Sequence, residues 1–182
     1  DILKFLDNNP LAIILAAGHF DGLGGVELLR QLQNRPFDVL HDPNRSVRAA
    51  FEISYERLNP EEQRLFVALG IFAGSDFSLE AVQALFFAVT TPQGPDGKSE
   101  VVIDEDIPIR LGHLVDVSLV RRSVETNRYS LHPLLKEYAK GKLESEDGFQ
   151  LRLAAYYAVC VLARVAAAPE NLDAIEAEFG NI

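Results

Sequence analysis

The sequence predicts a mostly helical fold: a small helical bundle, then a winged-helix domain with a short β-hairpin, then further helices. Apolar residues recur at three- and four-residue steps through most of the 182 residues, which is typical of amphipathic helices. Two short β-prone runs, residues 119–124 and 128–131, flank a turn. Three predicted helices precede this hairpin and one follows it, which is the order of elements in a winged helix. Residues 144–182 are predicted to begin an all-helical C-terminal region.

Residues 1–58 are predicted to form the helical bundle. Pro10 fits the first turn of a helix, where a missing N–H costs nothing, and Asn9 can cap that helix. Residues 11–17 are apolar on all sides, so we expect them to be buried. The later predicted elements of this bundle are a short amphipathic helix at residues 26–33 and a helix capped by Ser46.

Residues 59–143 are predicted to form the winged helix. Asn59 is the expected cap of its first helix, with Pro60 at the first helical position and Glu62 bonding back to the cap. Gly74 is expected to end this element. The later predicted elements are a helix capped by Ser78 at residues 79–87, an exposed insertion at 90–99, a helix at 107–117, the hairpin and a helix at 133–143.

The composition is that of a globular protein, with 48% hydrophobic and 24% charged residues. The net charge of -10 argues against nucleic acid as the main partner and against an anionic membrane surface, because both attract clustered Lys and Arg. No apolar run is long enough to span a bilayer, and the single cysteine cannot form an internal disulfide, so we expect a cytoplasmic location. The sequence has no methionine even at its start, so we expect a fragment of a longer protein.

Three short motifs stand in one order within the first 143 residues. Residues 8–13 read NNPLAI, and residues 54–66 read SYERLNPEEQRLF. The third motif combines LVDVSLV at residues 114–120 with YSLHPLLKEYA at residues 129–139. Together they resemble the STAND signalling ATPases of the NB-ARC class, most closely the bacterial regulators. The first is similar to the family's Gly-x-Pro-Leu-Ala motif, the second to the junction of helical lid and winged helix, and the third to the hairpin and Met-His-Asp-type motif.

In such proteins ADP lies between a P-loop domain and the lid. The resemblance implies that Pro10 packs on the adenine, with Asn9 and Leu11 as further candidates for nucleotide contact. It also implies that His132 reaches the β-phosphate of ADP in the closed state. A proline ring is a flat apolar surface, and a histidine can donate a hydrogen bond to a phosphate and lose it when domains rotate apart. For the intact protein, the resemblance implies ADP or ATP with magnesium, an upstream P-loop domain of the same chain as partner, and self-association on activation.

Two positions depart from the family motifs, and one part of the family machinery is missing. Asn8 stands where the family has a glycine, and Pro133 stands where the family has an acidic residue that would orient His132. The sequence contains no Gly-x-x-x-x-Gly-Lys-Ser/Thr motif, which cradles phosphates in P-loop ATPases. We therefore expect no catalytic residue and no enzymatic activity in this chain, and no tight binding of ADP by this chain alone.

Other candidate sites have simpler interpretations. His19, His41 and His113 share no ligand spacing on one helix, so we expect no metal site and no functional role for them. The acidic run at residues 104–106 is predicted to cap the helix that follows it. The two arginines at residues 121–122 could contact DNA through a wing, but a solvated strand or ion pairs between domains is the favoured interpretation.

The favoured function is that of a regulatory fragment in a nucleotide-switch signal-transduction ATPase, which covers bound ADP and transmits the ADP/ATP state to the rest of the protein. One alternative is an acidic winged-helix adaptor that binds protein and never meets nucleotide. A second alternative is a winged-helix transcription factor, which needs a contiguous basic stripe. Whether Pro10 and His132 face one common cleft separates the favoured function from the adaptor.

Overall fold

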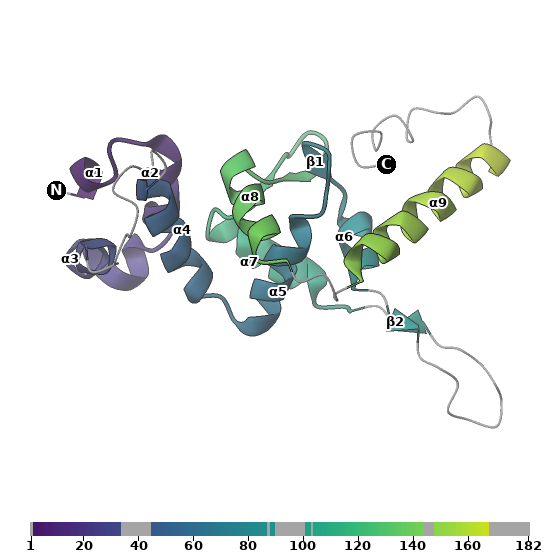
Figure 1. Ribbon diagram of the computed structural model, residues 1–182, viewed down its shortest axis with the longest axis horizontal. Helices are drawn as coiled ribbons and strands as arrows, with labels where there is room; N and C mark the ends of the chain where they lie inside the picture. Colours follow the sequence, from purple (N-terminus) through teal and green to yellow (C-terminus); the bar gives the residue numbers. More distant parts are fainter. Residues whose placement is uncertain are drawn as a thin grey trace, which may run out of the picture.

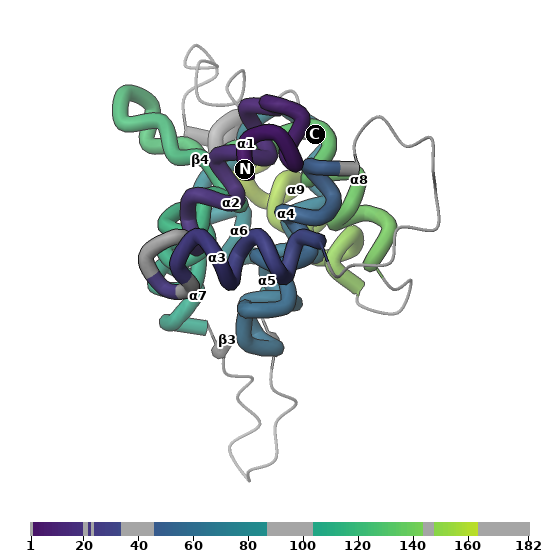
Figure 2. Tube along the Cα trace, turned by 90° about the vertical axis from the view of Figure 1, so that its left-hand side faces the viewer, coloured from purple at the N-terminus to yellow at the C-terminus, as the bar shows by residue number. Residues whose placement is uncertain are grey.

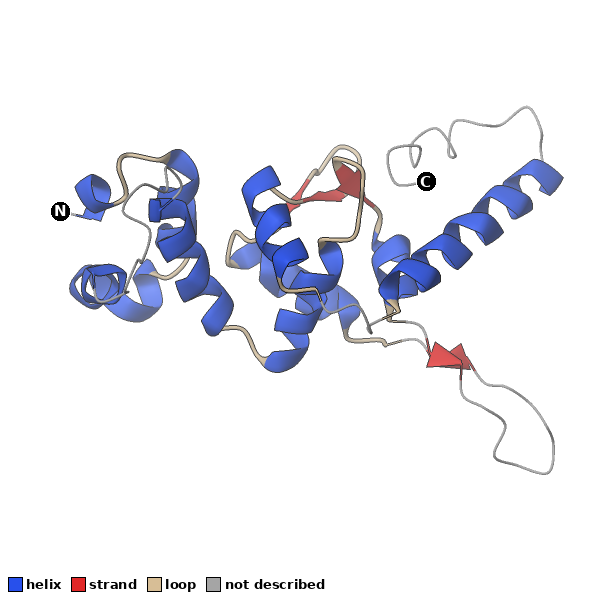
Figure 3. Cartoon of the chain, viewed as in Figure 1, coloured by secondary structure: helices blue, strands red, loops and turns tan. Residues whose placement is uncertain are grey.

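The computed structural model describes residues 2–33, 45–86, 88–89, 101–102, 104–143 and 148–167. It is mostly helical, with a three-stranded and a two-stranded antiparallel sheet (Figure 1, Figure 3). The helices are α1 (Ile2–Phe5), α2 (Pro10–Ala17), α3 (Phe20–Gln33), α4 (Arg45–Glu56), α5 (Pro60–Leu69), α6 (Leu79–Leu85), α7 (Ile107–Asp116), α8 (Pro133–Gly141) and α9 (Phe149–Ala167). The strands are β1 (Asp76–Phe77), β2 (Ala88–Val89), β3 (Val101–Val102), β4 (Arg121–Arg122) and β5 (Tyr129–Ser130). The predicted mostly helical fold with a winged-helix hairpin is confirmed.

The elements follow one another along the long axis of the molecule. Helices α1–α4 gather at the N-terminal end, α5–α8 and the three-stranded sheet lie in the middle, and α9 extends away from them after packing on α6 (Figure 1). In Figure 2 the molecule is turned by 90°, and the hairpin that begins at β4 protrudes from the body as the wing. Within the described ranges, no helix combines the length and apolar character needed to cross a membrane.

Helix α4 joins the N-terminal bundle to the winged helix through aromatic packing. The Phe51 side chain is 1% exposed, and its ring centroid lies 5.4 Å from that of Phe66 in α5 and 4.8 Å from that of Tyr138 in α8. The Lys142 ammonium lies 4.6 Å from the ring centroid of Tyr55 in α4. Each aromatic pair of this kind contributes about 0.5–1.5 kcal/mol beyond its buried area. The cluster therefore holds the bundle against α5 and α8.

The three-stranded sheet contains the predicted hairpin and one strand that was not predicted. β4 pairs with β5 in antiparallel register, with Arg121 opposite Ser130. β1 pairs with the other edge of β5, with Phe77 opposite Tyr129, and the two rings stack with centroids 6.4 Å apart. The two residues of β1 are too few to show an alternating pattern. This strand exists because of its pairing with a distant part of the chain.

Three predicted helix caps are confirmed. The Asn9 side chain caps α2, Asn59 and Glu62 form a complete capping box on α5, and Ser78 caps α6. The prediction that Ser46 caps α4 is wrong. The helix begins one residue before it, and the Ser46 hydroxyl is buried with no hydrogen-bond partner in the part of the chain that the structure describes.

Other element ends also differ from the predictions. Helix α5 ends at Leu69 rather than near Gly74, and Gly70 is its C-cap. The acidic run at residues 104–106 makes no side-chain capping bond to α7. Instead, both of its aspartates accept hydrogen bonds from Arg110 one turn into the helix. The two carboxylates therefore form ion pairs with Arg110 near the start of α7.

Two helices of the N-terminal bundle differ from the prediction. Helix α3 begins at Phe20 rather than at Val26, and it bends at Gly24, whose φ of 71° favours glycine. Helix α2 is not buried on all sides, because Leu15 is fully buried but Ile14 is 40% exposed. The exposed apolar side chain of Ile14 lies at the cavity described below.

Some predictions fall outside the described residues. They are the insertion at residues 90–99 and residues 168–182 of the predicted all-helical C-terminal region. β2 and β3 pair on either side of that insertion, with Ala88 opposite Val102, and neither strand was predicted. The domain boundaries at residues 58 and 143 stay predictions.

Replacing Gly70 by alanine is expected to destabilise the fold. An added Cβ would lie 2.9 Å from both the backbone nitrogen of Lys140 and the Cβ of Ala139, so α5 and α8 must move apart. Overpacking of this kind typically costs about 1–3 kcal/mol, which thermal unfolding would report as a lower Tm.

The matched control is Gly112→Ala in α7, where an added Cβ meets nothing within 4 Å. Alanine at this helical position is expected to raise stability by about 0.5–1 kcal/mol. Equal Tm values for the Gly70→Ala variant and the wild type would contradict the close approach of α5 and α8.

Candidate functional site

A cavity of about 300 Å³ lies where α2 meets the winged helix. Leu11 and Ile14 of α2 line it, together with Leu135 of α8 and residues 118–122, which lead into and form β4. His132, immediately before α8, lines it as well. The cavity therefore joins a residue of the first sequence motif to a residue of the third.

Helix α2 is positioned by contacts at both of its ends. The side-chain oxygen of Asn9 accepts hydrogen bonds from the backbone N–H groups of Leu11, at 3.0 Å, and Ala12, at 3.3 Å. At the C-terminal end, a Cβ added to Gly18 would lie 3.5 Å from the carbonyl oxygen of Val117. These contacts fix the start of α2 and bring its end close to the residues that follow α7.

The three predicted contact residues of the first motif differ from one another in their position relative to the cavity. Leu11 lines the cavity with only 8% of its surface exposed. Pro10 is exposed and is not among the described residues that line the cavity. The Asn9 oxygen is occupied by the cap. Leu11 and His132 thus share one cavity, but Pro10 does not line it. The criterion that Pro10 and His132 face one common cleft is therefore not met by this cavity, which contains only the neighbouring Leu11 of that motif.

His132 is the N-cap of α8, and this role decides which ring nitrogen stays available for another hydrogen bond. Its Nδ1 accepts a hydrogen bond from the backbone N–H of Leu134 at 3.3 Å. An accepting nitrogen carries no proton, so the proton of the neutral ring lies on Nε2. Burial lowers the pKa of His132, and the nearby positive charge of Arg121 lowers it further. At neutral pH the ring is therefore uncharged and carries an Nε2–H donor.

The cavity is cationic although the chain as a whole is acidic. Arg121, Arg122 and His132 line it, and no Asp or Glu of the described ranges does. The Arg122 guanidinium is engaged, because it donates to the side-chain oxygen of Asn127 and lies 5.8 Å from the ring centroid of Tyr129. Apolar side chains beside cations and a hydrogen-bond donor suit a ligand with an apolar ring and an anionic group.

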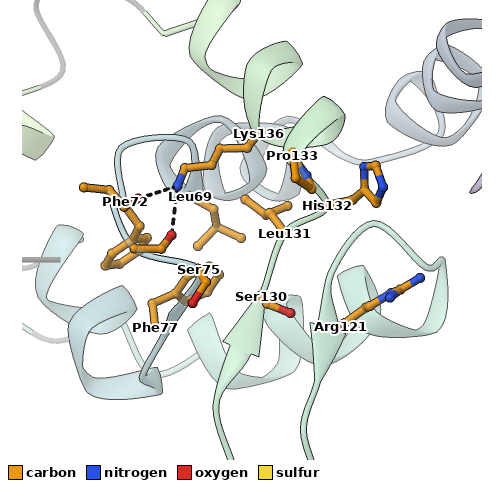
Figure 4. Close-up of a pocket in the computed structure, with 12 residues that line it drawn as sticks. Leu69, Phe72, Ser75, Phe77, Arg121, Ser130, Leu131, His132, Pro133 and Lys136 are labelled. Carbon is orange, nitrogen blue, oxygen red and sulfur yellow. Dashed lines mark hydrogen bonds between the residues drawn. The ribbon is translucent and has the colours of Figure 1, made fainter. Parts of the chain in front are cut away.

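Figure 4 shows a second cavity, of about 390 Å³, which shares Arg121 and His132 with the first. Lys136 lies on its other side, where the Nζ atom donates to the carbonyl oxygens of Ala73, at 2.9 Å, and Gly74, at 2.8 Å. Burial lowers the pKa of Lys136, with a smaller effect from a neighbouring lysine. Lys136 thus binds the turn after α5, whereas His132 and Arg121 project away from it.

The other histidines have structural partners or lie outside the described residues. The Nε2 atom of His19 lies 2.7 Å from the hydroxyl of Ser54 inside the N-terminal bundle. The Nδ1 atom of His113 lies 2.7 Å from a carboxylate oxygen of Glu62. His41 falls outside the described residues. No cluster of three His, Cys, Asp or Glu side chains that could hold a metal ion occurs in the ranges described above.

Helix α7 corresponds to the helix that reads bases in DNA-binding winged helices. Its arginine, Arg110, forms ion pairs with Glu61 at 2.9 Å, Asp104 at 2.6 Å and Asp106 at 3.4 Å. The neighbouring Ile109 is 72% exposed. Base recognition needs free donors in the major groove, and this arginine is bound by carboxylates.

Most residues of the cavity were not predicted as site residues, and Ile14 and Arg121 are two of them. Ile14 belongs to an apolar helix and was expected to be buried. Arg121 was interpreted as part of a solvated strand. Its position could have been inferred from the hairpin register, since a partner of Ser130 lies close to His132. Nothing local in the sequence marks Ile14, because its exposure depends on how α2 packs.

Acidic pH is expected to destabilise the chain through His19 and His132. Both pKa values lie below the ordinary value of 6.5 in the folded chain, chiefly because of burial. Below pH 6.5 the unfolded chain therefore binds more protons than the folded chain, and stability falls as the pH decreases through this window. The Tm of His132→Ser should depend less on pH than that of the wild type. Identical pH dependence in both proteins would contradict the lowered pKa of His132.

Binding to random duplex DNA at physiological salt is expected to be negligible. The net charge is -10, and the arginine of α7 is neutralised by three carboxylates. An electrophoretic mobility shift assay should show no complex. A shift at submicromolar protein would contradict this expectation and favour the transcription-factor alternative.

Comparisons with known proteins gave no match to any protein-family model. A stretch of 115 residues, 63% of this chain, is 32% identical to the regulatory protein AfsR of Streptomyces griseus. The identity to the regulatory protein AfsR of Streptomyces coelicolor is also 32% over 115 residues. The matched region covers only 10% of the length of either relative. The chain is therefore similar to a short part of two Streptomyces regulatory proteins.

Proposed function

We propose that this chain is the regulatory part of a nucleotide-switch signalling ATPase, which covers bound ADP and transmits the ADP/ATP state. The similarity to two Streptomyces regulatory proteins supports a signal-transduction regulator. The observation that carries the nucleotide-binding proposal is the cavity that joins Leu11 of α2 to His132 of α8. A ligand in this cavity contacts the lid and the winged helix at once.

The side chains of the cavity fit the two chemical ends of ADP. Leu11, Ile14 and Leu135 offer apolar surface to a base. The Nε2–H group of His132 offers a donor to a phosphate oxygen, and such charge-assisted hydrogen bonds are the stronger kind. The exposed Pro10 precedes Leu11 at the start of α2 and offers its ring to a part of the nucleotide that extends beyond the cavity.

In this proposal His132 distinguishes the two states of the switch. In the ADP state it binds the β-phosphate, while Leu11 and Ile14 contact the rest of the nucleotide. Rotation of the winged helix away from α2 breaks the His132 contact. A ligand shifts a conformational equilibrium only through contacts that differ between the two states. The His132 contact therefore favours the closed form.

ATP hydrolysis belongs to another part of the polypeptide in this proposal. An upstream P-loop domain binds the phosphates and magnesium, and the open form self-associates. The present chain lacks the P-loop lysine, so we expect no saturable ADP binding by residues 1–182 alone in the micromolar range.

Replacing His132 by alanine in the full-length gene product is expected to speed ADP release on the order of tenfold. The variant removes a hydrogen bond to a charged group, which contributes about 1.5–3 kcal/mol. A loss of about 1.4 kcal/mol corresponds to a tenfold change in affinity. Stopped-flow displacement of a fluorescent ADP analogue measures the rate. The same variant should self-associate without an activating signal.

His132→Ser separates the ligand contact from the helix cap. Serine is a strong N-cap residue, so the Tm should stay near that of the wild type, whereas His132→Ala should lose about 1 kcal/mol of stability. The serine hydroxyl is too short to replace Nε2, so ADP release should remain fast. A stable His132→Ser variant with wild-type ADP release would contradict the proposal and favour the acidic adaptor.

A further inference from the structure

We propose that Arg121 binds the terminal phosphate of a nucleoside diphosphate beside His132, and so makes the cavity selective for diphosphates over monophosphates. This inference rests on the proposed function and names a second phosphate contact within the same site. Three observations support it: the position of Arg121 and, among the described residues, its lack of a hydrogen-bond or ion-pair partner and the absence of acidic side chains from the cavity lining.

The pairing of two strands places Arg121 next to His132. Arg121 lies opposite Ser130 in the β4–β5 ladder, and Ser130 precedes His132 by only two residues along the chain. Both side chains line the cavity at α2 and also the neighbouring cavity. In Figure 4 they project to the same side, away from Lys136. Their proximity also accounts for the effect of the Arg121 charge on the pKa of His132.

The guanidinium of Arg121 is uncommitted in the part of the chain that the structure describes. It makes no ion pair and no hydrogen bond there. The nearby cations, in contrast, all have partners. Arg122 is bound to Asn127, Arg128 to Asp76, and Lys136 to backbone carbonyl groups.

The described residues around Arg121 do not supply a counter-ion. Neither cavity is lined by an Asp or Glu of the described residues, although the chain carries a net charge of -10. An unneutralised guanidinium beside a second donor is an arrangement that recognises anions, since arginine presents a rigid fork of N–H groups to phosphate oxygens. The charge of this cavity is therefore complementary to a phosphate group.

The position of this pair of donors predicts selectivity for a diphosphate. The apolar side chains of the cavity come from α2, α7, α8 and the segment before β4, whereas Arg121 and His132 meet at the end of the hairpin. When the base occupies the apolar part, the terminal phosphate of a diphosphate reaches both donors. A monophosphate lacks that group and forfeits both contacts.

The test compares Arg121→Gln with the wild-type full-length gene product by calorimetric titration with ADP and with AMP. The affinity for ADP should fall on the order of tenfold, the usual effect of losing a hydrogen bond between charged groups. The affinity for AMP should change by less than about twofold, within the range of a small surface effect. The Tm should change little, because the Arg121 side chain makes no hydrogen bond and no ion pair among the described residues.

Lys140→Gln is the matched control, because it removes the same charge from an exposed residue of α8 that lines neither cavity. Its ADP affinity should stay within about twofold of the wild type. If Arg121→Gln weakens ADP no more than Lys140→Gln, or weakens AMP equally, the assignment of Arg121 is overturned while the proposed function stands. If ADP binding does not depend on His132 either, the proposed function itself has failed.

Discussion

The cap on α8 links the fold of this chain to its site. Because the Nδ1 atom of His132 accepts the backbone N–H of Leu134, the start of a helix fixes the ring and leaves Nε2 as a donor. Pro133 needs no hydrogen bond at the first helical position and favours the start of the helix. In the proposed switch, the α8 backbone thus orients His132. In the family motif that this segment resembles, an acidic side chain has that role. The proline at this position is therefore compatible with a phosphate contact by His132.

Helix α8 also carries the contact that holds the N-terminal bundle. Its Tyr138 stacks on Phe51 of α4, and His132 lies at the start of the same helix. At the other side of the cavity, Gly18 at the end of α2 lies close to the carbonyl of Val117. A rotation of the winged helix relative to the bundle must therefore change the packing of α4, the contact at Gly18 and the distance from Leu11 to His132 together. This coupling is what a two-state switch requires.

Local signals predicted most of the elements, because caps and turns act within a few residues. The capping box of Asn59 and Glu62 is an example. The motif around His132 was found differently, through its resemblance to a family motif. Features that depend on distant contacts were missed. The strand β1 exists through its pairing with β5, and the exposure of Ile14 depends on the packing of α2. The proximity of Arg121 to His132 required the strand register, which the hairpin signal alone did not specify.

A crystal structure of the full-length gene product with bound ADP tests the central claim most directly. The account predicts a β-phosphate oxygen within about 2.7–3.2 Å of the Nε2 atom of His132, which is the range of a hydrogen bond. It also predicts the base against Leu11 and Ile14 of α2. ADP bound away from this cavity would contradict the account. So would a structure in which ADP is bound and α2 contacts the winged helix, but the Nε2 atom of His132 faces solvent.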